Sequence, residues 1–231
     1  MGLHLNFELR LHTGLTRAGV LARLERLRAF ASTTGVASVS HLVDLSSDGG
    51  DETNDRARNC IRFVAGCLAE PIEEDEIRPY IGEPETALGF VVDPGARAET
   101  ATFGLMRHRS LDGKHEEWFW WCGSKTQYAS LISDDHLVTV HTSLVAILDH
   151  AIELGFDVVV RDETGYWESR SAQALIAEVH KMNRIVAKLA GALGDALGDA
   201  LGHDHSLQAP IFEHRQFEHL EMERPDTESQ S

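Results

Sequence analysis

Apolar and polar residues alternate from Leu3 to Leu11, with leucine or phenylalanine at every second position. A period of two predicts a half-buried strand. Thr16 is a good helix N-cap, and apolar residues then recur at helical spacing as far as Gly35, which suits a helix end. Strand-like alternation resumes from Val36 to Leu45. We therefore expect a βαβ unit, and such a crossover makes its two strands parallel.

The middle of the chain predicts another helix followed by a run of strands. The helix extends from Asn54 to Glu70, with its apolar residues on one face. Three strand candidates follow at Ala87 to Val92, Thr100 to Arg107 and Glu117 to Cys122. The connections between these strands contain turn residues, which favours antiparallel neighbours. We expect a meander, which Thr126 to Ile132 extends.

The last third of the chain predicts a helix, a hairpin and a long helix. The first helix begins at His141 or Thr142 and ends at Gly155. The hairpin is formed by Phe156 to Val160 and Tyr166 to Glu168, and the long helix starts at Ser171. We interpret the acidic residues of the expected hairpin, Asp162, Glu163 and Glu168, as solvated, with paired acid/base carboxylates as the alternative.

This order of elements favours the α+β class. We expect a two-layer sandwich with a mixed sheet, formed by the N-terminal βαβ unit and the antiparallel meander, with helices mainly on one face and a partly ferredoxin-like arrangement. Residues 1–202 are expected to form one domain. Residues 203–231 are polar and end in PDTESQS, which predicts a mobile tail.

One stretch, Glu116 to Ser130, contains three of the four tryptophans of the chain. In a strand, Trp118, Trp120 and Cys122 point to one side, and Phe119 and Trp121 point to the other. Both faces are then apolar, so the strand needs cover on each side. Helices on one sheet face leave the other face open, and monomers rarely expose a large apolar patch. The sequence therefore predicts that this open face is an interface.

Composition excludes several classes of protein. No apolar run in the 231 residues approaches the roughly 20 needed to cross a bilayer, and the N-terminus has no signal-peptide pattern. Three cysteines do not form a disulfide framework, which indicates reduced thiols in a cytoplasm. The formal net charge of −16 argues against nucleic-acid binding, even by the arginine-rich first helix.

Residues after the tryptophan strand offer polar groups that could contact a ligand. Gly123, Ser124, Lys125 and Thr126 superficially resemble a phosphate-binding loop, but the glycine before the lysine and the second glycine are missing. We interpret this segment as a turn or a strand continuation. A narrower hypothesis is that Lys125, Thr126 and Gln127 contact a polar ligand whose flat part stacks on tryptophan.

Cys122 is a candidate nucleophile, with His136 or His141 as the base and Asp149 as the group that orients it, because a thiolate needs a proton acceptor held in place. A packed core thiol is the simpler interpretation. A small-molecule pocket would combine Cys122 with Trp118, Trp120 and Trp167.

Histidines near the C-terminus have ligand types suited to Zn²⁺ or Ni²⁺. The candidates are His203, His205, His214 and His219. Their spacing matches no zinc-finger or hydrolase pattern, so we expect a polar tail and no cofactor.

These observations favour a non-catalytic, cytoplasmic protein-interaction module that associates with itself or with a protein partner through an aromatic sheet face. Its contact residues are Trp118, Trp120, Trp121 and Trp167, with Lys125 and Gln127 nearby. The alternative is a small-molecule-binding protein or small enzyme with a tryptophan-lined pocket that uses Cys122, Lys125, His141 and Asp149.

Overall fold

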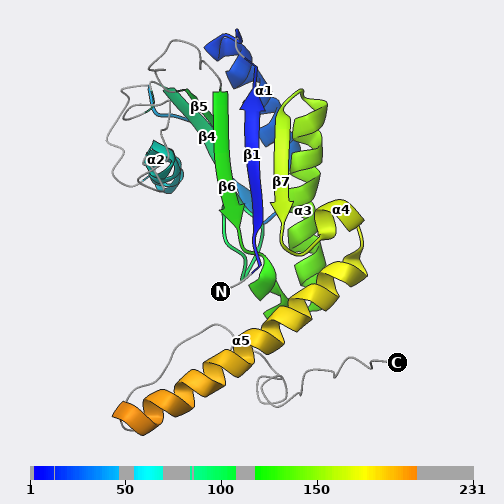
Figure 1. Cartoon of the computed structure of the whole chain (residues 1–231). Helices are drawn as coiled ribbons and strands as arrows, with labels where there is room; N and C mark the ends of the chain where they lie inside the picture. The colour runs from blue at the N-terminus through cyan, green and yellow to red at the C-terminus, as the bar shows by residue number, and fades with distance from the viewer. Residues whose placement is uncertain are drawn as a thin grey trace.

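The computed structural model describes residues 3–12, 14–46, 55–69, 84, 86–107 and 118–201, with the backbone alone for 67–69 and 191–201. Within these residues a seven-stranded sheet is packed against helices (Figure 1). The strands are β1 (Leu5–Leu11), β2 (Ser38–Val39), β3 (Val43–Asp44), β4 (Thr86–Asp93), β5 (Ala101–Arg107), β6 (Trp118–Ser124) and β7 (Asp157–Asp162). The helices are α1 (Arg17–Ala31), α2 (Arg56–Ala69), η1 (Gln127–Leu131), α3 (Asp134–Glu153), α4 (Tyr166–Ser169) and α5 (Ala172–Leu201).

The strand order is β2-β4-β5-β6-β1-β7, with β3 also paired to β4, and the strand pairs are antiparallel. The predicted α+β class is confirmed. The sheet is not mixed, however. Strands β1 and β2 run in the same direction, as a βαβ crossover requires, but β6, β5 and β4 lie between them. The crossover pattern in the sequence sets the direction of the two strands, and it does not say how many later strands are inserted between them.

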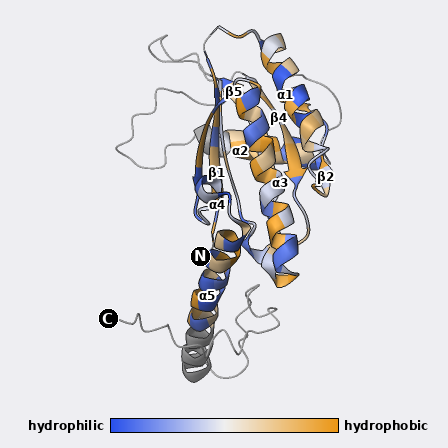
Figure 2. Cartoon of the chain, turned by 90° about the vertical axis from the view of Figure 1, so that its right-hand side faces the viewer, coloured by the Kyte–Doolittle hydropathy of each residue, from blue (hydrophilic) through white to orange (hydrophobic). Residues whose placement is uncertain are grey.

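Helices cover most of one sheet face and a smaller part of the other. Helices α1 and α3 lie together on one face (Figure 2). Helix α2 packs on the opposite side of β4 and β5, where a Cβ atom at Gly89 would lie 2.8 Å from Cδ1 of Ile61. Residues 87–92 of β4 are consequently buried on both faces. The face of α1 and α3 holds a stacked aromatic core, with ring centroids of Phe7 and Phe103 4.9 Å apart.

Several local predictions are confirmed and others are wrong. Thr16 caps α1 by accepting a hydrogen bond from the Gly19 N–H. Helix α3 begins at Asp134, seven residues before the predicted start, with Ser133 as its cap. Its first turn is polar and shows no apolar period, although acidic residues suit a helix N-terminus. The segment expected to extend the meander at Thr126 to Ile132 instead forms the short helix η1.

The expected hairpin is replaced by a strand and a short helix. Strand β7 is followed by α4, where a returning strand was predicted. The carboxylate of Asp162 accepts hydrogen bonds from the backbone N–H groups of Thr164 and Trp167, and this curls the chain into a helical turn. Gly165 and Arg170 adopt left-handed conformations at the two ends of α4.

Helix α5 begins against the domain and then extends away from the sheet (Figure 1). Leu175 and Val179 are buried in a small second core with Leu137 and Val140 of α3. No helix in the described ranges is both long enough and apolar enough to cross a membrane. The predicted tail at 203–231 lies outside the described residues.

Candidate interaction surface

Alternate side chains of the tryptophan strand lie on opposite faces of the sheet, as predicted. Trp118, Trp120 and Cys122 on β6 are buried, at 1, 0 and 5 % exposure, on the opposite side of the strand from Trp121. Phe119 is half-buried, and Trp121 keeps 44 % of its surface exposed. One apolar face of this strand is therefore closed by the domain itself, and the other is not.

The open region is the outer face of β6, β1 and β7, three strands that lie in front of α1 and α3 in Figure 1. Trp121 is the cross-strand neighbour of Glu8, which in turn is the neighbour of Val159. Val159 is 53 % exposed. We call this region the outer sheet patch; it comprises Glu8, Arg10, Phe119, Trp121, Asp157, Val159 and Arg161.

A glycine supports the position of Trp121. A Cβ atom at Gly123 would lie 3.8 Å from Cη2 of Trp121 and 2.5 Å from Oδ1 of Asn6. Gly123 thus leaves room for the Asn6 side chain, and the indole of Trp121 extends along the strand towards it. The indole is held against the sheet while its outer surface faces solvent.

Charges of both signs surround the two exposed apolar side chains. Arg10 and Glu8 form an ion pair of 2.8 Å along β1. Asp157 and Arg161 lie at the two ends of β7, on either side of Val159, and neither side chain has an ion-pair partner among the described residues. The patch therefore carries two acidic and two basic groups on a chain whose formal net charge is −16.

Trp120 and Cys122 hold strands β5 and β6 together by their side chains. The register between these strands includes one residue pair, Met106 with Phe119. Beyond it, Nε1 of Trp120 donates to the carbonyl of Thr102 at 3.1 Å, and the Thr102 N–H donates to Sγ of Cys122 at 3.3 Å. The two side chains thus satisfy backbone groups that a regular ladder would pair with β6.

These contacts argue for a structural role of Cys122. Burial raises the pKa of its thiol, which outweighs the lowering effect of the hydrogen bonds with Thr102. A thiol held in this state is a weak nucleophile. The proposed base and orienting group are engaged elsewhere, since His141 contacts Thr126 and Asp162, and Asp149 contacts Arg170.

His141 is the centre of a buried polar network that links α3 to the end of β7. Its Nδ1 lies 2.8 Å from Oγ1 of Thr126, and its Nε2 lies 3.2 Å from Oδ2 of Asp162. An ionised carboxylate only accepts, so Nε2–H of His141 donates to Asp162. The arrangement has the residue types of a hydroxyl–imidazole–carboxylate triad. All three residues are buried, so no substrate reaches the hydroxyl.

The interpretation of Asp162 as a solvated turn residue is wrong. Its side chain is fully buried and accepts hydrogen bonds from both the N–H and the hydroxyl of Thr164, at 2.9 and 2.7 Å. Burial by itself raises the pKa of this carboxyl, but the hydrogen bond and charge of His141, with the bonds from Thr164, lower it more. The pKa of Asp162 consequently lies below its ordinary value.

Lys125 and Gln127 are both engaged within the fold. Nζ of Lys125 lies 3.8 Å from Oε1 of Glu99. Gln127 is buried, where Oε1 accepts from the N–H of Leu3 at 2.9 Å and Nε2 donates to Asn183 at 2.7 Å. Gln127 therefore connects the N-terminus to α5. Its side chain is buried, so no atom of it is accessible for the predicted ligand contact.

Asp149 and Trp167 meet at Arg170 on the far side of α3. The Arg170 guanidinium forms a bidentate pair with Asp149, at 2.7 and 2.9 Å, and lies 4.3 Å from the ring centroid of Trp167. Asp149 and Arg170 border a shallow cavity of about 510 Å³ that Tyr166 also lines. Trp167 does not join the layer of Trp118 and Trp120, and the predicted pocket of Trp118, Trp120, Trp167 and Cys122 is not formed.

The metal candidates His203, His205, His214 and His219 lie outside the described residues. In the described ranges, no group of three or more histidine, cysteine, aspartate or glutamate side chains is placed to hold a metal ion.

No protein-family model matches the chain, and neither a curated protein nor a solved structure matches it significantly. The function therefore has to be inferred from the contacts of its own residues.

Proposed function

We propose that the protein is a non-catalytic interaction module that forms a homodimer through the outer sheet patch. The observation that supports this proposal is the exposure of Trp121 and Val159, at 44 and 53 %, on the two strands that flank Glu8. An exposed indole beside an exposed valine on an uncovered sheet face is the kind of surface that a partner protein covers.

The charges of the patch favour a second copy of the chain as the partner. Two chains with a formal net charge of −16 repel each other over most of their surfaces. The outer sheet patch is locally balanced, because Glu8 and Asp157 are matched by Arg10 and Arg161. A two-fold axis applies the same patch to itself, and a patch with charges of both signs allows an arrangement in which acidic groups of one copy meet basic groups of the other.

The area of the outer sheet patch indicates how tightly the proposed dimer binds. Three neighbouring strands of about seven residues cover roughly 15 by 23 Å, or about 350 Å² on each copy, which is smaller than a standard specific interface and is typical of a weak, transient contact. The tryptophan is the residue type most enriched at interface positions that carry the binding energy. We therefore expect a dimer with a dissociation constant in the micromolar range, in exchange with monomer.

Sedimentation velocity tests the proposal. The native chain is expected to sediment as a species heavier than 25.6 kDa at a loading of about 100 µM and as a monomer well below the dissociation constant. Trp121→Asp is expected to remain monomeric at both concentrations with an unchanged far-UV circular dichroism spectrum. Ile152→Asp is the matched control, because Ile152 is similarly exposed, at 48 %, on α3.

Two results would count against the dimer: a native chain that is monomeric at the higher concentration, or a Trp121→Asp variant that self-associates as the native chain does. Trp120→Asp cannot serve as the test, because Trp120 is fully buried and its replacement by a charge is expected to unfold the domain.

A cytoplasmic location is consistent with this proposal, since Cys60 and Cys122 are both free thiols. The alternative of a tryptophan-lined ligand pocket has less support, because Cys122, Lys125, His141 and Asp149 each contact a different partner in a different part of the fold.

A further inference from the structure

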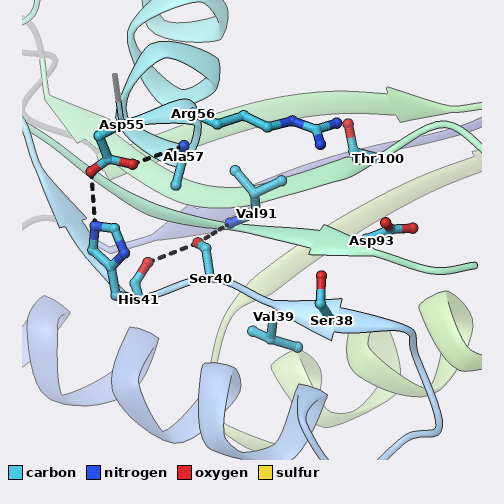
Figure 3. A pocket seen from close by; sticks show the side chains of 10 residues that line it. All are labelled: Ser38, Val39, Ser40, His41, Asp55, Arg56, Ala57, Val91, Asp93 and Thr100. Carbon is cyan, nitrogen blue, oxygen red and sulfur yellow. Dashed lines mark hydrogen bonds and ion pairs between the residues drawn. The ribbon is translucent and has the colours of Figure 1, made fainter. Parts of the chain in front are cut away.

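A cavity of about 300 Å³ opens between β2, β4 and the first turn of α2 (Figure 3). It lies at the opposite edge of the sheet from the outer sheet patch, so it is independent of the proposed dimer. Its floor is apolar and includes the buried side chains of Ala57 and Val91, with Val39 beside them. Its rim is polar throughout: Ser38, Ser40, His41, Asp55, Arg56, Asp93 and Thr100.

One side of the cavity is fixed by hydrogen bonds. Oδ1 of Asp55 accepts from the Ala57 N–H at 3.0 Å, and Oδ2 lies 3.0 Å from Nε2 of His41 (Figure 3). Ser40 donates to the His41 carbonyl at 2.8 Å and accepts from the Val91 N–H at 2.9 Å. These bonds join β4, the segment after β2 and the start of α2 into one wall.

The other side of the cavity carries polar groups that have no hydrogen-bond or ion-pair partner among the described residues. Arg56 and Thr100 both line this side of the cavity (Figure 3), and within the described part of the chain neither side chain has a hydrogen-bond or ion-pair partner. Ser38 is the cross-strand neighbour of Asp93, and its hydroxyl is likewise unpaired among the described residues. Asp93 uses Oδ1 to accept from the Gly95 N–H at 3.1 Å, which leaves Oδ2 available.

We infer that this cavity binds a small zwitterion, namely a free α-amino acid with a short aliphatic side chain. Arg56 and Thr100 would donate hydrogen bonds to its carboxylate, because a guanidinium is well suited to bind a carboxylate with two bonds. The carboxylate of Asp93 would accept from the ammonium group, together with the hydroxyl of Ser38. The aliphatic side chain would rest on Ala57 and Val91.

The distribution of charge selects this class of ligand over simpler ones. A carboxylate without an amine would be bound by Arg56 but repelled by Asp55 and Asp93. An amine without a carboxylate would be attracted by Asp55 and Asp93 but repelled by Arg56, and it would leave the guanidinium without a partner. A volume of about 300 Å³ is at the lower end of the range for ligand sites, which fits a molecule of amino-acid size.

The experiment is an NMR titration of isotope-labelled protein with L-valine, followed through the backbone amide signals of Val91 and Thr100. Isovalerate and isobutylamine are the matched ligands, because each keeps the branched skeleton of valine and lacks one of its two charged groups. We expect saturable shifts with L-valine below about 10 mM, and binding at least about tenfold weaker for the two singly charged ligands.

Three variants locate the site. Arg56→Gln and Asp93→Asn are each expected to weaken L-valine binding by about tenfold or more, which corresponds to about 1.4 kcal/mol. The amide oxygen that the second substitution introduces can still accept from the Gly95 N–H, so the local fold is kept. Arg62→Gln, which removes a similar exposed charge from the same helix, is expected to bind as the native chain does.

The inference is overturned if L-valine produces no saturable shift, if isovalerate or isobutylamine binds as tightly as L-valine, or if Arg56→Gln leaves the affinity unchanged. A loss of binding in Arg62→Gln as large as that in Arg56→Gln would also overturn it, because binding would then depend only on overall charge.

Discussion

Nε1 of Trp120 donates a hydrogen bond of 3.1 Å to the backbone carbonyl of Thr102 on the neighbouring strand, at a point where no residue pairing joins β5 and β6. The same indole nitrogen lies 3.2 Å from the Thr102 hydroxyl. An aromatic side chain thus replaces part of a strand ladder. Trp120 thus links β5 to β6, whereas its neighbour Trp121 faces outward.

Replacement of Trp120 by phenylalanine is expected to destabilise the domain by about 2–3 kcal/mol, because the buried Thr102 carbonyl loses its donor and part of the indole volume is removed. Urea unfolding, at a protein concentration below the dissociation constant of the proposed dimer, measures the change in the free energy of unfolding. Trp121→Phe is the control, since its exposed indole should contribute less than about 0.5 kcal/mol to monomer stability. Equal stabilities for the two variants would contradict the structural role of Trp120.

Two glycines are expected to respond in opposite directions to replacement by alanine. A Cβ atom at Gly104 would lie 2.6 Å from the Leu88 carbonyl oxygen and 3.0 Å from the Trp120 ring, so Gly104→Ala should cost about 2 kcal/mol or more. A Cβ atom at Gly66 on α2 would meet no atom within 4 Å, so Gly66→Ala should stabilise the helix by about 0.5–1 kcal/mol. Thermal and urea unfolding of both variants check the signs. A neutral Gly104→Ala would show that the close packing of β4, β5 and the indole can relax.

The buried carboxylate of Asp162 is expected to make stability depend on pH in acid. Its folded pKa lies below the ordinary value near 3.9, so its ionised form stabilises the fold above that pH. This contribution is lost as the pH falls below the unfolded pKa and through the folded one. Asp162→Asn should therefore cost about 3 kcal/mol at neutral pH, and the difference from the native chain should shrink below about pH 3.9.

Urea unfolding at a series of pH values measures this difference. Asp157→Asn, on the exposed side of the same strand, serves as the control and is expected to show little change at any pH. A cost for Asp162→Asn that stays constant from pH 7 into acid would contradict the assignment of an ionised, hydrogen-bonded carboxylate.

Local patterns were sufficient for much of the secondary structure. The alternation in β1 and β6 identified which residues are buried, and the Thr16 cap marked the start of α1. Predictions were wrong where hydrogen bonds from a polar side chain to the backbone a few residues away direct the chain, because such bonds leave no apolar period in the sequence. Hydrogen bonds to Asp162 fold the following residues into a helical turn where a hairpin was predicted. The first turn of α3 is polar, so periodicity did not reveal it, although the Ser133 cap and the acidic residues favour a helix there.

The candidate sites were only partly visible in the sequence. The aromatic strand pointed to an open apolar face, but alternation alone could not show which of Trp120 and Trp121 the helices cover. Asp162 was noticed as an acidic residue, yet its partner His141 lies on another element 21 residues away. The cavity beside Arg56 combines residues from β2, β4 and α2, which no short motif brings together.

The sequence by itself determined the α+β class, the two-sided apolar character of the tryptophan strand and the strongly acidic charge, because periodicity and composition are properties of neighbouring residues. Only the tertiary structure decided that the sheet is antiparallel, that α2 covers β4 and β5 but leaves β6, β1 and β7 open, and that Cys122, His141 and Asp149 lie apart. The physical reason is that cover and proximity depend on which strands are neighbours in the sheet, and strand order is set by packing between segments distant in the chain.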